Sequence, residues 1–315
     1  MSEFFLELFS EEIPAGLQKN LREKIFEDFK NLFEEKSIRS KKNFSFSTPN
    51  RLVLVFEGLD KQIKIKSKEI RGPKTSAPEQ ALEGFLRSNK IKKKDLLKKK
   101  TEKDEFYFYK TSAISLKTHD LLTEFIPKIL SNYQWKKSMK WGEFDLNWGR
   151  PLKSILSIFD KKIVSFKFHH LASSNLTFLD KDFEEKKRSF ENFKKYEKFF
   201  EDNGVIINQN KRLKIINKAF LKILGKKGLK INENTKLMDE VVNLVDSPNV
   251  LLCKFDKKFL SVPKEILTLT MESHQKYFPT FNDKNEITNE FLIVTNKKDK
   301  KGLIKIGNEL SLIHI

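Results

Sequence analysis

Hydrophobic residues recur along this chain with two spacings, which separate its expected helices from its expected strands. Apolar side chains return every four positions from Leu17 to Phe33 and predict an amphipathic helix that ends near Glu35. Alternating or continuous short apolar runs predict strands over 3–9, 43–47, 51–57, 61–66, 105–111, 154–159, 163–169, 250–255, 277–281 and 288–295. Further helices are expected over 78–88, 119–132, 181–202, 209–225 and 236–245, with a short one from Pro263.

This order of elements predicts an α+β fold, with mixed or antiparallel sheets at both ends of the chain flanking a helical middle segment. A length of 315 residues is enough for about two domains. We expect an amino-terminal α+β domain over 1–170 and a helical segment over 171–248. A strand-rich segment over 249–315 is expected to pack with the amino-terminal region and to be incomplete at its carboxy end. The lysine-rich stretch 90–100 is expected to be a solvated helix face and loop.

The net charge of +19 is compatible with a polyanionic partner. Lysine outnumbers arginine 54 to 8, however, and Asn, Ile and Phe are also abundant. That composition is typical of an AT-rich genome, so the total charge permits nucleic-acid binding more than it indicates it. The positions of the few arginines are more informative, because the guanidinium offers a planar fork for phosphates and bases.

Composition also limits location and chemistry. No run of about 18 apolar residues is present, so no membrane span is expected. The start of the chain lacks the layout of a signal peptide. The single cysteine, Cys253, lies in an apolar run and is expected to be buried and reduced. We therefore expect a cytoplasmic protein.

No self-contained catalytic centre or metal site is predicted. Phosphate-loop and dinucleotide motifs are absent, and no Cys/His spacing fits zinc. The His169-His170 pair ends a predicted strand, where neighbouring side chains point to opposite faces. The Glu11-Glu12 pair precedes Pro14 and could bind a metal or an amine. A helix start favours acidic residues, so we interpret the pair as helix-capping charges.

All three tryptophans lie between residues 135 and 148, beside four basic residues. Flat rings can stack on unpaired bases, while Lys and Arg can neutralise phosphates. The alternative is that the tryptophans are buried anchors at a sheet edge with solvated lysines around them, and the usual burial of large aromatic residues favours it.

Four ordered blocks of sequence resemble the beta subunit of bacterial heterotetrameric glycyl-tRNA synthetase. They are residues 9–14 (Phe-Ser-Glu-Glu-Ile-Pro); 48–52 (Thr-Pro-Asn-Arg-Leu), followed by 69–73; 139–142 (Met-Lys-Trp-Gly) with 150–151; and 274–279 (His-Gln-Lys-Tyr-Phe-Pro), followed by 291–296 and 307–309. Each block alone is a weak signal, and their order over residues 3–309 makes the resemblance specific.

The chain departs from the family pattern at two places. Residues 174–178 (Ser-Asn-Leu-Thr-Phe) stand where the family has a Gly-His-Arg-Phe element. After Gly307-Asn308-Glu309 the sequence reads Leu-Ser-Leu-Ile-His-Ile instead of a basic, apolar segment. We expect a truncated or frameshifted product that covers less than about half of the family's length, without its HD-like helical and anticodon-binding domains.

The resemblance implies a division of labour between two subunits of an alpha2-beta2 tetramer. The alpha subunit holds the ATP and glycine site and uses ATP and Mg²⁺, none of which this chain is expected to bind. This chain would bind tRNA-Gly and position it. No association with a membrane is expected. Its amino-terminal region is similar in general character to the editing-type domain of the phenylalanyl enzyme's beta subunit. Glycine is the smallest amino acid, so we expect RNA contact without hydrolysis. The alternatives are a free-standing basic RNA-binding module and an inactive truncated remnant.

The candidates for tRNA contact are the basic and aromatic residues of these blocks and of the tryptophan segment. They are Arg51, Arg71, Lys74, Lys136, Lys137, Lys140, Trp141, Arg150, His274, Lys276 and Tyr277. Each has a structural alternative: Arg71 could belong only to a turn, Trp141 and Tyr277 could be core residues, and Arg150 could pair with Asp145 or Glu143.

Overall fold

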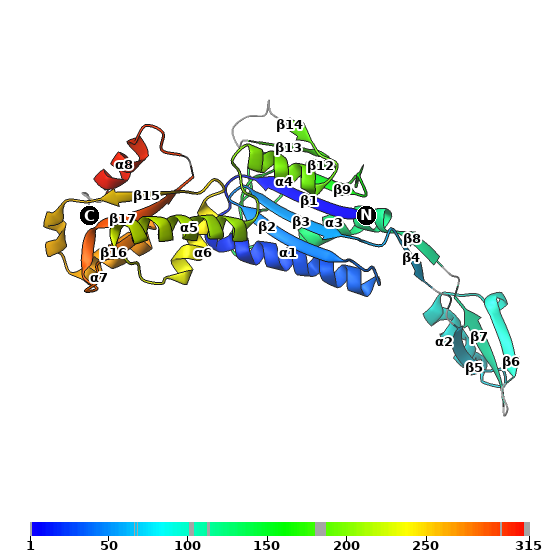
Figure 1. Ribbon diagram of the computed structural model, residues 1–315. Helices are drawn as coiled ribbons and strands as arrows, with labels where there is room; N and C mark the ends of the chain where they lie inside the picture. The colour runs from blue at the N-terminus through cyan, green and yellow to red at the C-terminus, as the bar shows by residue number, and fades with distance from the viewer. Residues whose placement is uncertain are drawn as a thin grey trace.

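A computed structural model describes residues 2–65, 67, 69–100, 104–111, 114–179, 187–296 and 298–311. Figure 1 shows a central sheet with helices on it, a small lobe at the end of a narrow ribbon, and a second lobe at the opposite end that contains the later part of the chain. Helices and sheets alternate throughout the described chain, which confirms the α+β class.

The central sheet is built around the first strand. β1 (Glu3–Ser10) pairs antiparallel with β3 (Arg51–Glu57) on one side and with β9 (Leu152–Phe159) on the other. The full strand order is β11 (Lys167–Phe168), β12 (Leu171–Ser174), β9, β1, β3 and β2 (Lys42–Thr48), and the short β10 (Lys162–Ile163) also pairs with β9. The strands predicted over 3–9, 43–47, 51–57 and 154–159 are thereby confirmed.

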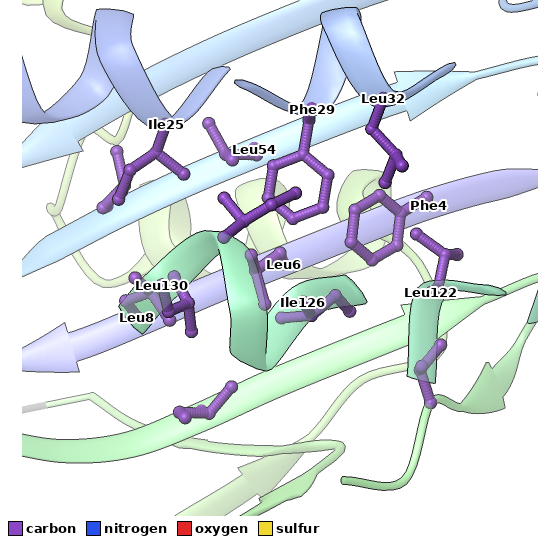
Figure 2. Close-up of a cluster of buried hydrophobic side chains, with 14 of the residues drawn as sticks. Phe4, Leu6, Leu8, Ile25, Phe29, Leu32, Leu54, Leu122, Ile126 and Leu130 are labelled. Carbon is purple, nitrogen blue, oxygen red and sulfur yellow. The ribbon is translucent and has the colours of Figure 1, made fainter. Parts of the chain in front are cut away.

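Successive side chains of β1 point to opposite faces of this sheet, and both faces are buried. Figure 2 shows its even-numbered apolar side chains, from Phe4 to Leu8, meeting side chains of α1 (Ala15–Glu35) and α3 (Thr118–Asn132), among them Phe29 and Ile126. Burying each such side chain contributes about 1.5–3 kcal/mol, so this layer supplies much of the core. The four-residue apolar period predicted for α1 forms its buried stripe.

The opposite face of the sheet carries α4 (Phe193–Asp202), whose Phe193 and Tyr196 pack on Phe5 of β1 and whose Phe200 belongs to the same buried cluster. A small hairpin lies beside it, formed by β13 (Leu176–Phe178) and β14 (Lys187–Ser189). The helix predicted over 181–202 is wrong over 187–192, because β14 occupies Lys187–Ser189 and α4 begins at Phe193. Residues 181–186 lie outside the described residues. Asn192 caps α4, since its Oδ1 accepts the Lys195 N–H at 2.9 Å.

The distal lobe (residues 69–111) stands away from the central sheet at the end of a two-stranded ribbon (Figure 1). The ribbon strands are β4 (Gln62–Ile65) and β8 (Ile114–Lys117). The lobe contains β5 (Glu69–Lys74), α2 (Glu79–Asn89), the short 3-10 helix η1 (Lys93–Asp95), β6 (Leu96–Lys100) and β7 (Glu105–Lys110), with β7 between β5 and β6. The expectation of a helix face and loop over 90–100 is wrong over 96–100, because Leu96–Lys100 pairs as an edge strand with β7.

The later part of the chain forms a helical pair followed by a three-stranded antiparallel sheet. Its elements are α5 (Gln209–Lys227), α6 (Thr235–Leu244), β15 (Asn249–Lys254), η3 (Lys257–Ser261), α7 (Lys264–Leu269), the π-helical turn η4 (Thr270–Gln275), β16 (Phe278–Phe281), β17 (Ile287–Thr295) and α8 (Leu303–Ser311). The strand order is β15-β17-β16. Cys253 is buried here as predicted, and burial raises the pKa of its thiol to about 12.

Two smaller predictions needed correction. The helix expected to stop at Gly225 continues to Lys227, where Gly228 ends it at φ 62° in the left-handed region. The hairpin expected from 154 to 169 pairs over only two residues of β10, because β12 takes the place beside β9 in parallel. The division at residues 170 and 248 stays a prediction, and the distal lobe was not anticipated as a separate body.

Two buried polar side chains join α5 and α6 to the central sheet. The guanidinium of Arg212 is fully buried and donates to the carbonyls of Val242, Ile206, Ile207 and Ser47 at 2.7–3.0 Å. Gln18 of α1 donates to the Asn243 carbonyl at 2.7 Å. Burial lowers the pKa of Arg212 to about 10.

Candidate nucleic-acid interface

Parts of the first three sequence blocks, at residues 10–11, 50 and 151, converge where β1 ends. The Ser10 N–H donates to the Asn50 carbonyl and the Glu11 N–H donates to the Pro151 carbonyl, both at 2.9 Å. The Asn50 amide returns a bond to the Ser10 carbonyl at 3.2 Å. Residues that are 40 to 140 positions apart thus form one continuous backbone network. Many block residues, such as Ser10 and Asn50, are buried and serve to hold this corner together.

Glu11 of the acidic pair does not cap the following helix. No acidic residue lies in the first turn of α1, and Pro14 precedes that turn without a side-chain cap. Glu11 instead pairs with Lys153 at 2.5 Å. The capping interpretation of the pair is therefore wrong for Glu11, whose partner comes from β9.

The tryptophan loop (residues 133–151) connects α3 to β9 and rests on buried aromatic rings. Met139 and Trp148 form an isolated antiparallel bridge, with backbone bonds of 2.8 and 3.1 Å. Trp148 is only 2% exposed and packs edge-on against Trp135 and Phe168, with ring centroids 5.0 and 5.7 Å apart. The alternative that the tryptophans are buried anchors is therefore correct for Trp148.

Gly149 is required by the close approach of the Trp135 ring. A Cβ at this position would lie 2.1 Å from a carbon of that ring, so Gly149→Ala forces the indole out of place. We expect a loss of about 1–3 kcal/mol in the free energy of unfolding, with a change in tryptophan fluorescence. Gly225→Ala in α5 is the matched control: nothing lies within 4 Å of its Cβ, and a helical alanine stabilises by about 0.5–1 kcal/mol. Equal effects of both changes on urea unfolding would contradict this assignment.

The tryptophan loop carries four basic side chains together with the exposed Glu143 and Asp145. Lys136, Lys137 and Lys140 are exposed, and Arg150 is half-buried with Nη1 donating to the Gly149 carbonyl at 3.2 Å. The alternative pairing of Arg150 with Asp145 or Glu143 is not formed in the described residues. These four cations therefore remain available to an anionic ligand.

A second pair of rings lies at the tip of the loop. Trp141 is half-buried, packs on the core and approaches His170 at 5.9 Å. Phe144, which is 43% exposed, stacks on His170 with centroids 3.7 Å apart and planes at 9°. Burial, followed by the nearby His169 charge, lowers the pKa of His170 and favours the neutral ring. Sequence reasoning missed Phe144 and His170, because phenylalanine is abundant here and the pairing joins the loop to the turn after β11.

A cavity of about 240 Å³ adjoins the loop where α1 meets the end of α3. Its lining includes Asn20 and Asn132, the rings of Tyr133 and Trp135, and Lys136. Burial raises the pKa of Tyr133, so its hydroxyl stays protonated. The cavity thus places amide groups and ring surfaces directly beside the first exposed lysine of the loop.

Arg51 is a core residue in this structure. It is 2% exposed, its Nε lies 3.4 Å from Glu7 Oε2, and its guanidinium lies between the rings of Phe9 and Phe200 at 4.5 and 4.6 Å. It also donates to the Phe178 carbonyl. The prediction that Arg51 contacts RNA is not compatible with this burial, so Arg51 is no longer a candidate for RNA binding.

The buried carboxyl of Glu7 organises the network around Arg51. The hydroxyls of Thr177 and Tyr196 both donate to it. Burial raises the pKa of Glu7 against the opposing effect of Arg51, and burial together with Glu7 raises the pKa of Tyr196 well above its usual value. Thr177 belongs to the segment that departs from the family's Gly-His-Arg-Phe element, so this segment has a packing role here.

Arg71 and Lys74 lie in the distal lobe, away from the tryptophan loop. Both are exposed. Arg71 lies over the Phe106 ring at 3.6 Å, and Lys74 pairs with Asp104 at 2.6 Å. Arg71 thus does more than form a turn, since it covers Phe106, the buried ring among the described residues of the lobe.

The fourth block mostly builds the core of the carboxy-terminal sheet. Tyr277 is buried, stacks on Phe291 at 5.0 Å and donates to Asn308 Oδ1 at 2.6 Å. Lys276 is half-buried and pairs with Glu240 at 2.9 Å. His274 alone of the three candidates is exposed. The core alternative is therefore correct for Tyr277, which is not available for stacking on a base.

The candidate residues thus fall into three separate regions of the fold. Lys136, Lys137, Lys140, Trp141 and Arg150 share the tryptophan loop, which carries more of the candidates than either other region. In the part of the chain that the structure describes, no group of three or more His, Cys, Asp or Glu side chains could hold a metal ion. The described helices include none that is long and apolar enough to cross a membrane.

Comparisons with known proteins agree with the four blocks. The sequence model of the family described as "Glycyl-tRNA synthetase beta subunit" matches residues 4–312. The Glycine--tRNA ligase beta subunits of Rickettsia felis and Rickettsia conorii are 36% and 38% identical over 312 and 310 residues. These alignments cover 98% of this chain but 47% and 46% of the relatives, so the chain spans about half of their length. The beta subunit of Rickettsia bellii is similar, at 38% identity over 98% of this chain. The chain belongs to the glycyl-tRNA synthetase beta subunit family.

Proposed function

We propose that this chain is part of a glycine–tRNA ligase and provides tRNA-binding surface to an alpha subunit that carries the adenylation site. Family membership supports the ligase assignment. The observation that carries the RNA-binding role is the tryptophan loop, where a packed pair of indole rings supports a segment with the exposed Lys136, Lys137 and Lys140 and the half-buried Arg150. ATP, Mg²⁺ and glycine would be bound by the alpha subunit.

The physical contribution of such a surface is orientation. Cations on a rigid loop neutralise phosphates and fix the RNA in one register, while the base edges stay available to other parts of the complex. Holding the acceptor end in a productive position converts a bimolecular step into an effectively unimolecular one. The contact between the buried Trp148 and the half-buried Trp135 restricts the loop and thereby lowers the entropy lost on binding.

Reconstitution tests the ligase assignment. The chain is mixed with a beta-dependent alpha subunit, ATP, Mg²⁺, glycine and tRNA-Gly, and charged tRNA is measured. Charging that requires the chain supports the proposal. RNA binding without any association with alpha would indicate the free-standing module instead. A folded chain that binds neither tRNA nor alpha would indicate the inactive remnant. A cytoplasmic location stays a prediction.

Neutralising the tryptophan loop tests the RNA-binding surface. The variant K136Q/K137Q/K140Q/R150Q is expected to weaken tRNA binding and to lower the slope of log affinity against log salt by about 0.7–0.9 for each phosphate that the loop no longer neutralises. The control K42Q/K236Q/K284Q/R188Q removes the same charge from exposed positions on other elements. Identical salt slopes for the two variants would remove the loop from the proposal.

A further inference from the structure

The distal lobe presents a second basic surface, distinct from the tryptophan loop. Figure 1 shows the lobe projecting from the central sheet on the β4–β8 ribbon. Its buried apolar residues among those described are Leu82 and Phe106, so it has only a small core. A body of this kind contributes little to folding the rest of the chain, and its projection leaves its surface open to a large partner.

The proportion of lysine in residues 90–100 of this lobe is far higher than in the chain as a whole. Seven of the eleven residues from 90 to 100 are lysine, against 54 of 315 overall. An AT-rich genome accounts for the overall proportion, which would place about two lysines in a stretch of this length. All seven lysines are exposed: Lys90, Lys92, Lys93, Lys94, Lys98, Lys99 and Lys100.

Most of these charges have no internal partner. Within the described residues only Lys99 of the seven forms an ion pair, with Glu69. Lysines on an edge strand discourage pairing with other sheets, which explains the three lysines at 98–100 on β6. That role does not extend to Lys92, Lys93 and Lys94, which precede the strand. Clustered like charges repel one another, and a polyanion on this surface would relieve the repulsion.

The aromatic rings of the lobe support the sheet instead of offering stacking platforms. All five rings of its described residues are buried or half-buried, and Arg71 covers Phe106. The most exposed large apolar side chain is Leu97, at 49%. Proteins that bind single strands combine basic grooves with exposed aromatic rings, whereas double-helical RNA offers mainly phosphates and 2′-hydroxyls. A basic surface without exposed rings fits the backbone of an RNA helix.

We propose that the distal lobe binds the phosphate backbone of a double-helical RNA segment through the lysines of residues 92–100, independently of the tryptophan loop. The inference rests on the proposed function, because the RNA helix would belong to the tRNA that the loop contacts. The lobe acts as a sequence-independent arm on a ribbon, and the tryptophan loop remains the surface at the central sheet.

The test uses the whole chain carrying K92Q/K93Q/K94Q/K98Q/K100Q, which spares the paired Lys99. The control K19Q/K42Q/K194Q/K236Q/K284Q removes five charges from exposed positions elsewhere. Affinity for tRNA, for an RNA hairpin with a stem of about 16 base pairs and for a single strand of equal length is measured by fluorescence anisotropy over a salt series. Circular dichroism confirms that both variants remain folded.

We expect the lobe variant to bind tRNA and the hairpin about tenfold or more weakly, with a salt slope lowered by about two units or more relative to the control. The affinity for the single strand should fall much less. A lobe variant that matches the control on the hairpin overturns the inference, and so does an equal loss on the single strand. If the tryptophan-loop variant still weakens tRNA binding in that case, the proposed function stands and only the role of the lobe fails.

Discussion

Replacing Arg51 with methionine is expected to lower the free energy of unfolding by about 3–5 kcal/mol at pH 7.5, since removing one partner of a buried ion pair leaves the other charge uncompensated. The remaining group is Glu7, which is fully buried between β1 and α4. Methionine keeps much of the volume between the rings of Phe9 and Phe200, so the loss reports mainly on the charge.

This loss should shrink as the pH falls. Burial already raises the pKa of Glu7, and Arg51 is the largest influence that lowers it. Without Arg51 the folded-state pKa of Glu7 rises further above the unfolded value near 4.5. A raised folded-state pKa gives stability that is complete below the unfolded pKa and is lost as the pH rises through the folded pKa. R51M should therefore regain stability relative to the natural protein between pH 7.5 and about 4.5.

The matched control is the double variant E7Q/R51M. Thr177 and Tyr196 donate to separate oxygens of Glu7, so the oxygen of a glutamine can accept from one hydroxyl while its NH2 donates to the other. Glutamine also carries no charge to bury. Replacing both ion-pair partners by neutral groups is often close to neutral, so the double variant should be more stable than R51M at pH 7.5 and should lack its pH dependence. Urea unfolding at pH 5 and 7.5 measures both quantities. An R51M deficit that is equal at the two pH values would contradict the assignment.

Replacing Arg212 with alanine is the second change with a large expected effect. The four carbonyls that its guanidinium satisfies come from the α4–α5 connection, from α6 and from β2. Each buried hydrogen bond to a charged group contributes about 1.5–3 kcal/mol, and the carbonyls lose their donors without gaining water. A loss of about 3–5 kcal/mol is expected, because a buried network of this kind is among the mechanisms that give exceptional destabilisation.

The position of Arg212 gives this change a distinct signature. Its bonds join α5 and α6 to the central sheet, so R212A should increase proteolysis at the α4–α5 connection before the core of the sheet unfolds. Arg212→Lys keeps the charge but lacks the planar fork and should fall between the natural protein and R212A. Arg39→Ala, at an exposed pair with Asp60, should leave stability nearly unchanged. An R212A variant with the stability and protease resistance of R39A would exclude this role.

Much of the fold was predictable from periodicity. The apolar stripe of α1 and the runs of β1 and β3 are long, and each pattern has only one regular structure that buries it. The failures lie where a local pattern is ambiguous. The charged stretch before Phe193 has the composition of a solvated helix, but its last residues pair with β13. Leu96–Lys100 becomes a strand because β7 offers an apolar edge that the stretch itself does not reveal.

The candidate site was predictable in residue type and only partly in position. Lys136, Lys137 and Lys140 are exposed because lysine is costly to bury, so the sequence predicted their exposure, while their contact with RNA stays a prediction. Arg51, Trp148 and Tyr277 have chemistry that suits either a ligand or a core. Their partners, such as Glu7 for Arg51 and Asn308 for Tyr277, are decided by strand pairing and packing.

By itself the sequence determined the α+β class, the basic charge and the family, because these depend on composition, period and the order of short blocks. Only the tertiary structure decided which cations are free. A side chain's desolvation depends on groups brought to it from distant parts of the chain, as Phe178 is brought to Arg51. The tertiary structure also decided that the lysines of residues 90–100 lie on a projecting lobe. β4 pairs with β8, and the segment between these two strands forms the lobe.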